Sequence, residues 1–194
     1  MDTGADPAVI YGPMMASAQR TDPPRGPFVA VDFETADSGR DSACAVGLVR
    51  VEEDAVVERV VRLIRPPRRR FEFTYIHGLR WTDVAHEPTF GEVWPELAPV
   101  LKNVRFLVAH NAGFDRSVLR ACCARHRLVP PSLPFECTVK WARKTWGIYP
   151  TNLPAVCRHL ELALRHHDAG SDAEACARIM IAARRARVAS STMD

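Results

Sequence analysis

The chain has 194 residues, of which 47% are hydrophobic and 25% are charged, and its formal net charge is +3. These average values exclude a collagen-like fibre, a wholly disordered chain and a bundle of membrane-spanning helices. The mild positive charge permits nucleic-acid binding but does not require it. The N-terminus lacks the apolar stretch of a secretory signal, and the six cysteines include no C-x-x-C pair. We therefore expect a cytoplasmic protein with reduced thiols and no membrane segment.

The N-terminal part of the chain predicts a flexible arm followed by three β-strands. Residues 1–26 contain four prolines and no periodic pattern, which is typical of a flexible arm. Valine-rich segments at 28–34, 43–51 and 55–64 predict strands. The three acidic residues 52–54 make a connection that is short enough for a β-hairpin between the last two strands.

The middle of the chain predicts two helices separated by one more strand. Apolar residues recur with a helical period over 89–101, and Thr89 with Glu92 can form a capping box at its start. Prolines inside this segment predict a kink or a shorter helix. A short buried strand is expected at 105–109, and a helix is expected after it at 114–126.

The last third of the chain predicts three helices, at 139–146, 153–160 and 171–187. The order of strands and helices indicates an α/β protein with one mixed central sheet and flanking helices. We expect this domain to cover residues 27–187 and a C-terminal tail to cover residues 188–194.

Four acidic residues occupy positions where a site is expected. Asp32 and Glu34 lie two residues apart on the first strand, so their side chains share one face of the sheet. Such a pair is most often a solvated sheet face. Asp115 follows the strand at 105–109 and Asp172 begins the last helix, where an acid can simply favour the helix dipole. However, open α/β sheets place their sites at the carboxyl ends of strands, and crowded acids call for a cation.

A histidine accompanies the last of these acids. His167 precedes Asp172 by five residues in an expected loop, where an imidazole can exchange protons at neutral pH. A lone histidine in a loop is more often merely exposed. The informative feature is therefore the whole set of four acids and one histidine.

These residues belong to three segments that resemble a known family. The segments Val31-Asp-Phe-Glu-Thr35, His110-Asn-Ala-Gly-Phe-Asp115 and His167-x-Ala-x-x-Asp172 are similar, in this order, to the three motifs of the DEDDh 3′–5′ exonucleases. The strongest likeness is to the proofreading epsilon subunit of bacterial DNA polymerase III. It covers residues 27–187 and implies a ribonuclease H-like exonuclease fold.

The resemblance also implies a mechanism. The matching acids Asp32, Glu34, Asp115 and Asp172 would hold two divalent cations, Mg²⁺ or Mn²⁺, which favour oxygen ligands. Two such ions activate a water molecule and stabilise the leaving 3′-oxygen. His167 would take the proton of the water. His166 is its neighbouring rival, but it lies six residues from Asp172 where the motif has five.

The resemblance further implies a binding site for the terminal nucleotide. The positions that match are Thr35, Ile76, His77 and Phe114, although Phe114 could equally serve in helix packing. An apolar or aromatic surface can stack on any base, which suits trimming without sequence preference. The arginines at 65, 68, 69 and 70 could contact phosphates or form a solvated basic loop.

The expected function is therefore 3′–5′ hydrolysis of single-stranded nucleic acid, with DNA favoured and nucleoside 5′-monophosphates as products. The alternatives are an exoribonuclease of the same family and a catalytically silent nucleic-acid-binding or adaptor module. All four acids and the histidine are present, which favours the enzyme. A polymerase is a candidate partner, but the sequence shows no tethering segment, which favours a stand-alone nuclease or a separated domain over a replicative subunit.

Overall fold

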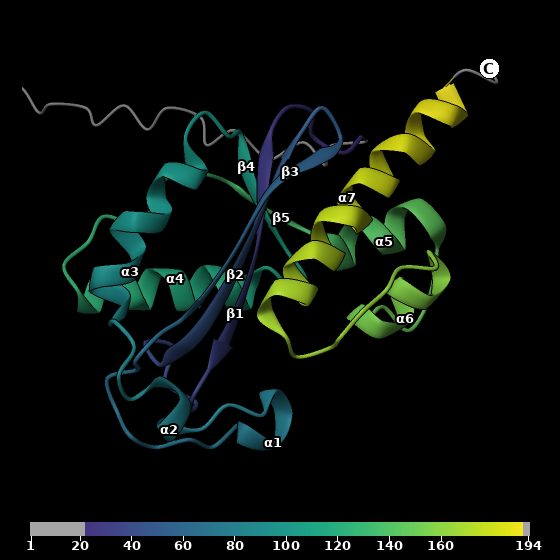
Figure 1. Cartoon of the computed structure of the whole chain (residues 1–194). Coiled ribbons are helices and arrows are strands. Elements are labelled where there is room, and N and C mark those ends of the chain that lie inside the picture. The colour runs from purple at the N-terminus through teal and green to yellow at the C-terminus, as the bar shows by residue number, and fades with distance from the viewer. Residues whose placement is uncertain (1–21, 192–194) are drawn as a thin grey trace, which may run out of the picture.

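A five-stranded mixed sheet forms the centre of the computed structural model, which describes residues 22–191 of the chain (Figure 1). The strand order is β3-β2-β1-β4-β5. The strands are β1 (Phe28–Thr35), β2 (Ala43–Glu52), β3 (Ala55–Leu63), β4 (Phe106–Ala109) and β5 (Phe135–Cys137). β1, β2 and β3 are antiparallel, whereas β4 runs parallel to β1 and to β5. The predicted mixed sheet is confirmed, and most of the predicted N-terminal arm lies outside the described residues.

The predicted hairpin between β2 and β3 is also confirmed. Glu53 and Asp54 both have positive φ angles, of 49° and 58°, as a tight turn between antiparallel strands requires. The β3 strand that follows is an edge strand with mostly exposed side chains.

The helices follow the predicted order, with two additions. The long ones are α3 (Phe90–Leu97), α4 (Gly113–Arg125), α5 (Thr138–Trp146), α6 (Leu153–His159) and α7 (Ala169–Ser191). The additions are α1 (Thr74–His77) and α2 (Trp81–Val84), which are too short to show a hydrophobic period in the sequence.

One helix is shorter than its apolar segment, as the prolines predict, and another is longer than predicted. The segment predicted as one helix over 89–101 ends as an α-helix at Leu97 and continues as a 3₁₀ turn, η1 (Ala98–Leu101), while its capping box between Thr89 and Glu92 forms as expected. At the other end of the chain, α7 continues to Ser191, into the segment expected to be a tail. Among the described residues, no helix is both long and apolar enough to cross a bilayer.

The central strand β1 sends alternate side chains into two helical layers. Val29, Val31 and Phe33 pack with α3 and α4 on one face of the sheet. Phe28 and Ala30 pack with α5, α6 and α7. These three helices cover the other face of the sheet (Figure 1). Asp32 and Glu34 have the same parity as Phe28 and Ala30. They therefore face the α7 layer, at the end of β1 where the apolar core stops.

A glycine brings α7 close to these acids. Gly47 on β2 lies opposite Asp32 in the antiparallel ladder, so both positions share one face. A Cβ atom at Gly47 would lie only 2.1 Å from the carbonyl oxygen of Ala169, at the start of α7. The missing side chain lets the first turn of α7, which carries Asp172, approach the sheet beside Asp32.

Candidate active site

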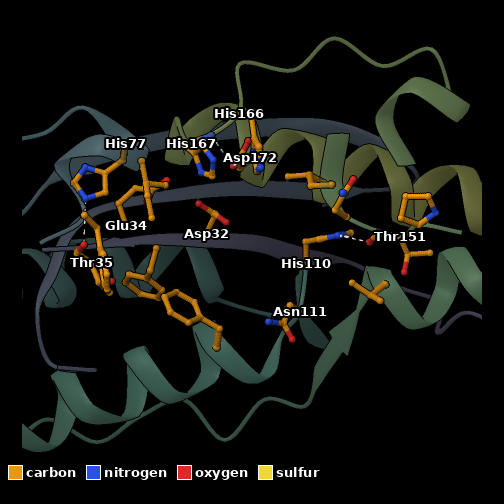
Figure 2. Close-up of a pocket in the computed structure, with 18 of the residues that line it drawn as sticks. Asp32, Glu34, Thr35, His77, His110, Asn111, Thr151, His166, His167 and Asp172 are labelled. Carbon is orange, nitrogen blue, oxygen red and sulfur yellow. Dashed lines mark hydrogen bonds and ion pairs between the residues drawn. The ribbon is translucent and has the colours of Figure 1, made fainter. Parts of the chain in front are cut away.

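A cleft of about 790 Å³ lies at the carboxyl end of β1, between the sheet, the start of α7 and the α1 segment. Of the nine residues predicted for the site, the cleft is lined by Asp32, Glu34, Thr35, Ile76, His77, Phe114, His167 and Asp172. Figure 2 shows His77 and Thr35 at one end, Thr151 at the other, and the acids between them. The structure thus brings together segments that are far apart in the sequence.

Three of the predicted acids form a compact group. Carboxylate oxygens of Asp32, Glu34 and Asp172 all lie within 4.8 Å of one another. Asp32 and Glu34 come from β1, and Asp172 comes from the first turn of α7. Oδ1 of Asp172 has no hydrogen-bond partner in the described part of the chain. Among the described residues, it is the only buried side-chain oxygen or nitrogen atom without one. A buried carboxylate oxygen without a partner is costly unless a ligand completes it.

The fourth acid, Asp115, lies next to this group but does not line the cleft. It is 1% exposed in the first turn of α4, and its Oδ1 accepts a hydrogen bond of 3.1 Å from the backbone N–H of Phe33. This contact links α4 to β1 between Asp32 and Glu34. Its charge nevertheless raises the pKa of two of the three cleft acids, Asp32 and Glu34.

The pKa values of the acids are raised, because the carboxylates are buried close to one another. Burial raises the pKa of Glu34 to about 7, helped by the charges of Asp172 and Asp115. Burial likewise raises the pKa of Asp115 to about 7. The pKa of Asp32 is raised by burial and then by the neighbouring Asp115, Asp172 and Glu34. Ionising all four acids at neutral pH therefore costs free energy that a bound cation would offset.

Two adjacent histidines contact Asp172 in different ways. Nδ1 of His166 lies 2.9 Å from Oδ2 of Asp172, whereas His167 donates its backbone N–H to the same oxygen at 3.0 Å. The two rings are stacked, with centroids 3.8 Å apart. His167 has a φ of 68°, an unusual conformation for a residue other than glycine. Burial and then His166 lower the pKa of His167, so its ring is neutral at pH 7.

Three of the predicted nucleotide-contact residues, Thr35, Ile76 and His77, lie at the α1 end of the cleft. His77 donates from Nε2 to the carbonyl oxygen of Thr35 at 3.1 Å and accepts at Nδ1 from the N–H of Leu79. Both of its ring nitrogens are thus used within the chain. Ile76 is 36% exposed beside it. The fourth, Phe114 on α4, also lines the cleft, and the guanidinium of Arg40 lies 4.5 Å from the centre of its ring.

The opposite end of the cleft contains residues that sequence reasoning did not assign. His110 lies 2.8 Å from the hydroxyl of Thr138 and donates from Nε2 to the carbonyl oxygen of Thr151 at 2.9 Å. Burial lowers the pKa of His110 to about 4, so its ring is neutral at pH 7 and brings no positive charge to the acids. Arg143 and Tyr149 line the same end. His110 belongs to the second motif, which was the one available signal.

The predicted basic loop is only partly free for a ligand. Arg68 donates to Asp37 at 2.8 Å and to Asp41 at 2.6 Å. Arg70 forms an ion pair with Glu72, and Arg69 lies over the ring of Trp81. Most of the loop's charge therefore stabilises the surface around it.

The donor set fits divalent cations. Carboxylate oxygens are the ligands that Mg²⁺ and Mn²⁺ prefer. The compact group of Asp32, Glu34 and Asp172, the oxygen of Asp172 without a hydrogen-bond partner and the raised pKa values all indicate a site that a cation would stabilise.

Comparison with known proteins then decides the family. A family model described as Exonuclease matches residues 29–180. The chain belongs to this exonuclease family. With its three motifs it is a DEDDh 3′–5′ exonuclease domain of the DNA polymerase III epsilon type, and the predicted hydrolytic nuclease is confirmed. Exonucleases of this kind use divalent metal ions.

Two curated relatives place the exonuclease domain within larger proteins. The DNA polymerase III PolC-type protein of Thermotoga petrophila is 30% identical over 161 residues, which cover 79% of this chain and 12% of that protein. A putative bifunctional exonuclease/endonuclease of Mycobacterium tuberculosis is 32% identical over 127 residues, or 60% of this chain and 19% of that protein. The chain thus spans a small fraction of the length of these relatives.

Solved structures confirm the ribonuclease H-like exonuclease fold. The nuclease domain of 3′hExo, a DEDDh family member bound to rAMP, has a TM-score of 0.70 at 17% identity and covers 83% of this chain and 92% of its own. Exonuclease X in complex with 5′ overhanging duplex DNA has a TM-score of 0.67 at 24% identity, with 81% and 91% covered.

Proposed function

We propose that this chain removes terminal nucleotides from the 3′ end of single-stranded nucleic acid, with DNA as its main substrate, and releases nucleoside 5′-monophosphates. The observation that carries this proposal is the compact group of Asp32, Glu34 and Asp172 inside the cleft. Carboxylates without a compensating cation suit the binding of metal ions on a phosphodiester.

The four acids Asp32, Glu34, Asp115 and Asp172 would hold two divalent cations. When bound, two such ions supply an activated water and stabilise charge on the leaving 3′-oxygen. The chain orients its acids for this task, because Phe33 fixes Asp115 and the histidine pair fixes Oδ2 of Asp172. The other oxygen of Asp172 is left for a ligand.

His167 is the proposed general base. Its lowered pKa leaves the ring neutral and able to accept a proton at pH 7. The backbone hydrogen bond from His167 to Asp172 ties the ring's position to the acid group. His166 contacts Asp172 through its own ring, and we assign it the role of holding that carboxylate.

Thr35, Ile76, His77 and Phe114 are the proposed contacts of the terminal nucleotide. Ile76 and Phe114 present apolar surface to the cleft, which can stack on any base. His77 would contribute the face of its ring, since both of its nitrogens are already bonded.

A digestion of 5′-labelled single-stranded DNA and RNA of equal sequence tests the function. We expect a ladder that shortens from the 3′ end with Mn²⁺, no cleavage with EDTA, and no cleavage by Asp32→Ala. Faster loss of the DNA would support the substrate preference, and faster loss of the RNA would contradict it. Intact substrates under all conditions would favour a catalytically silent binding module.

A polymerase is a further proposed partner, because the PolC-type relatives are DNA polymerases by name. Gel filtration of the chain with the replicative DNA polymerase of the organism that encodes it tests this association. Co-elution would support it, and separate elution at micromolar concentrations would contradict it.

A further inference from the structure

An exposed aromatic ring lies at the rim of the cleft, away from the proposed terminal-nucleotide contacts. Tyr149 lines the cleft, yet the residue is 88% exposed. It lies two residues before Thr151, which Figure 2 shows at the opposite end of the cleft from His77 and Thr35. A ring this exposed contributes little to the packing of the chain itself, whereas it offers a flat apolar surface to a ligand.

A positively charged side chain lies at the same end. Arg143 on α5 lines the cleft and donates from Nε to the hydroxyl of Thr151 at 2.9 Å. Within residues 22–191, no carboxylate pairs with its guanidinium, and both terminal NH₂ groups have no partner. By contrast, the exposed Arg68 and Arg125 are each bound by an aspartate elsewhere on the surface. The single bond to Thr151 orients Arg143 and leaves its phosphate-binding groups unused.

The position of this end relative to the acids indicates which part of a substrate strand would lie there. The group of Asp32, Glu34 and Asp172 lies between the His77 end and the Thr151 end of the cleft (Figure 2). If the terminal nucleoside occupies the His77 end, the phosphodiester to be cleaved lies at the acids. The strand must then leave the cleft past Thr151, where Arg143 and Tyr149 lie.

We propose that Arg143 and Tyr149 form a subsite for the nucleotides upstream of the cleaved bond, with the base stacked on Tyr149 and a phosphate bound by Arg143. This inference rests on the proposed exonuclease function and assigns the substrate as a strand that extends beyond the dinucleotide. Both side chains recognise features common to all nucleotides, so the subsite binds without sequence preference.

Two assays on the full chain separate this subsite from the catalytic centre. The first measures kcat/KM with Mn²⁺ for thymidine oligonucleotides of increasing length and for the p-nitrophenyl ester of thymidine 5′-monophosphate. The ester has no upstream nucleotide. The second measures binding of a fluorescent thymidine octanucleotide by anisotropy with Ca²⁺ in place of Mn²⁺, with a gel to show that the oligonucleotide stays intact.

Tyr149→Ala and Arg143→Gln should each weaken octanucleotide binding and raise its KM by about 5- to 100-fold, the range of one stacking or phosphate contact. Hydrolysis of the ester should stay within about twofold of wild type, because it does not use the subsite. Arg143→Gln should also reduce the slope of log Kd against log salt by about 0.7. Tyr149→Phe, which keeps the ring, should behave as wild type.

Two control variants match these changes outside the cleft. Tyr75 is 82% exposed but does not line the cleft, so Tyr75→Ala should leave octanucleotide binding unchanged. Arg120 is exposed on α4, on the other face of the sheet. Arg120→Gln is the control for Arg143→Gln and should also leave octanucleotide binding unchanged.

Two results would overturn the subsite. One is unchanged octanucleotide binding in both Tyr149→Ala and Arg143→Gln. The other is an equal loss on the ester, which would place the residues in the catalytic centre. A wild-type chain that hydrolyses nothing would instead contradict the proposed function, and the binding assay would still decide the subsite.

Discussion

Two groups of acidic residues lie near each other on β1 and the loop that follows it, in opposite electrostatic surroundings. Asp37 and Asp41 both bind Arg68, and Asp41 also binds Arg125. The hydrogen bonds from Arg68 lower the pKa of each of these aspartates. In the cleft, burial and the neighbouring acids raise the pKa of Asp32 and Glu34 instead.

The difference shows which acids serve the fold and which serve the site. The chain has 26 lysines and arginines, and those near the β1–β2 loop neutralise Asp37 and Asp41. No arginine or lysine forms an ion pair with the cleft acids among the described residues. A group of acids that the chain leaves without a cation is arranged for a cation from solution, at a cost in stability.

The largest expected effect comes from exchanging one acid in each group. Asp32→Asn should lower exonuclease activity by about 10³-fold or more, because it removes a metal ligand. The same variant should raise the melting temperature of the metal-free chain, because it relieves repulsion with Asp115, Asp172 and Glu34. Steady-state rates and a thermal melt in EDTA measure the two effects.

Asp41→Asn is the matched change in the other group. It removes the charge that pairs with Arg125 and one of the two that pair with Arg68, so it should lower the melting temperature and leave activity within about threefold. Equal effects of the two variants on activity, or a lower metal-free melting temperature for Asp32→Asn, would contradict the contrast between the groups.

Added metal should stabilise the exonuclease through the cleft alone. At a concentration one hundred times Kd, Mn²⁺ should raise the free energy of unfolding by about 2.7 kcal/mol, since it binds only the folded site. Chemical denaturation with and without Mn²⁺ measures this gain. Asp32→Asn should lose most of it, and Asp41→Asn should keep it. An unchanged unfolding curve for wild type in saturating Mn²⁺ would argue against a metal site here.

Much of the fold could be predicted because its signals are local. The valine-rich strands, the hairpin and the capping box of Thr89 with Glu92 each depend on a few residues that are neighbours in the sequence. The short helices α1 and α2 could not be predicted, because four residues are too few to show a helical period. The extension of α7 to Ser191 was hidden by a weak apolar pattern at its end.

The resemblance to the family motifs named the candidate site residues, but it could not give their arrangement. The motifs name Asp32, Asp115 and Asp172 together, yet only the structure shows that Asp115 lies behind β1 on the N–H of Phe33. The bond from His110 to Thr151 joins residues 41 positions apart. Gly47 shows its role only through the close approach of α7. Such contacts depend on tertiary packing, which leaves no local pattern.

A smaller effect should come from the structural group itself. Asp37→Ala should lower the free energy of unfolding by about 2 kcal/mol, because it leaves Arg68 and the N–H of Gly39 without their buried partner. Arg70→Ala, which breaks an exposed ion pair with Glu72, should cost less than about 0.5 kcal/mol. Urea denaturation compares the two. Equal losses would contradict the expectation that the more buried ion pair, Asp37 with Arg68, contributes more to stability than the exposed pair of Arg70 with Glu72.

The last prediction concerns pH, where the raised pKa values of the four candidate metal ligands fix the sign. Glu34 and Asp115 each titrate at about 7 in the metal-free fold, above the ordinary values of about 4 in the unfolded chain. The metal-free protein should therefore gain stability as the pH falls through 7 towards 4. A cation must displace these protons, so the Mn²⁺ concentration for half-saturation should rise as the pH falls below 7.

The expected size of the pH effect is about tenfold in apparent Kd per pH unit for each proton released. Mn²⁺ titrations followed by thermal shift at about pH 6 and about pH 8 measure it. Glu34→Gln removes one titrating group, so this variant should bind Mn²⁺ more weakly but with a shallower dependence on pH. Asp41→Asn, whose acid has a lowered pKa, should keep the wild-type slope. An apparent Kd that is equal at both pH values would show that these acids are already ionised without a metal. Their pKa values would then not be raised by burial, and the prediction would be wrong.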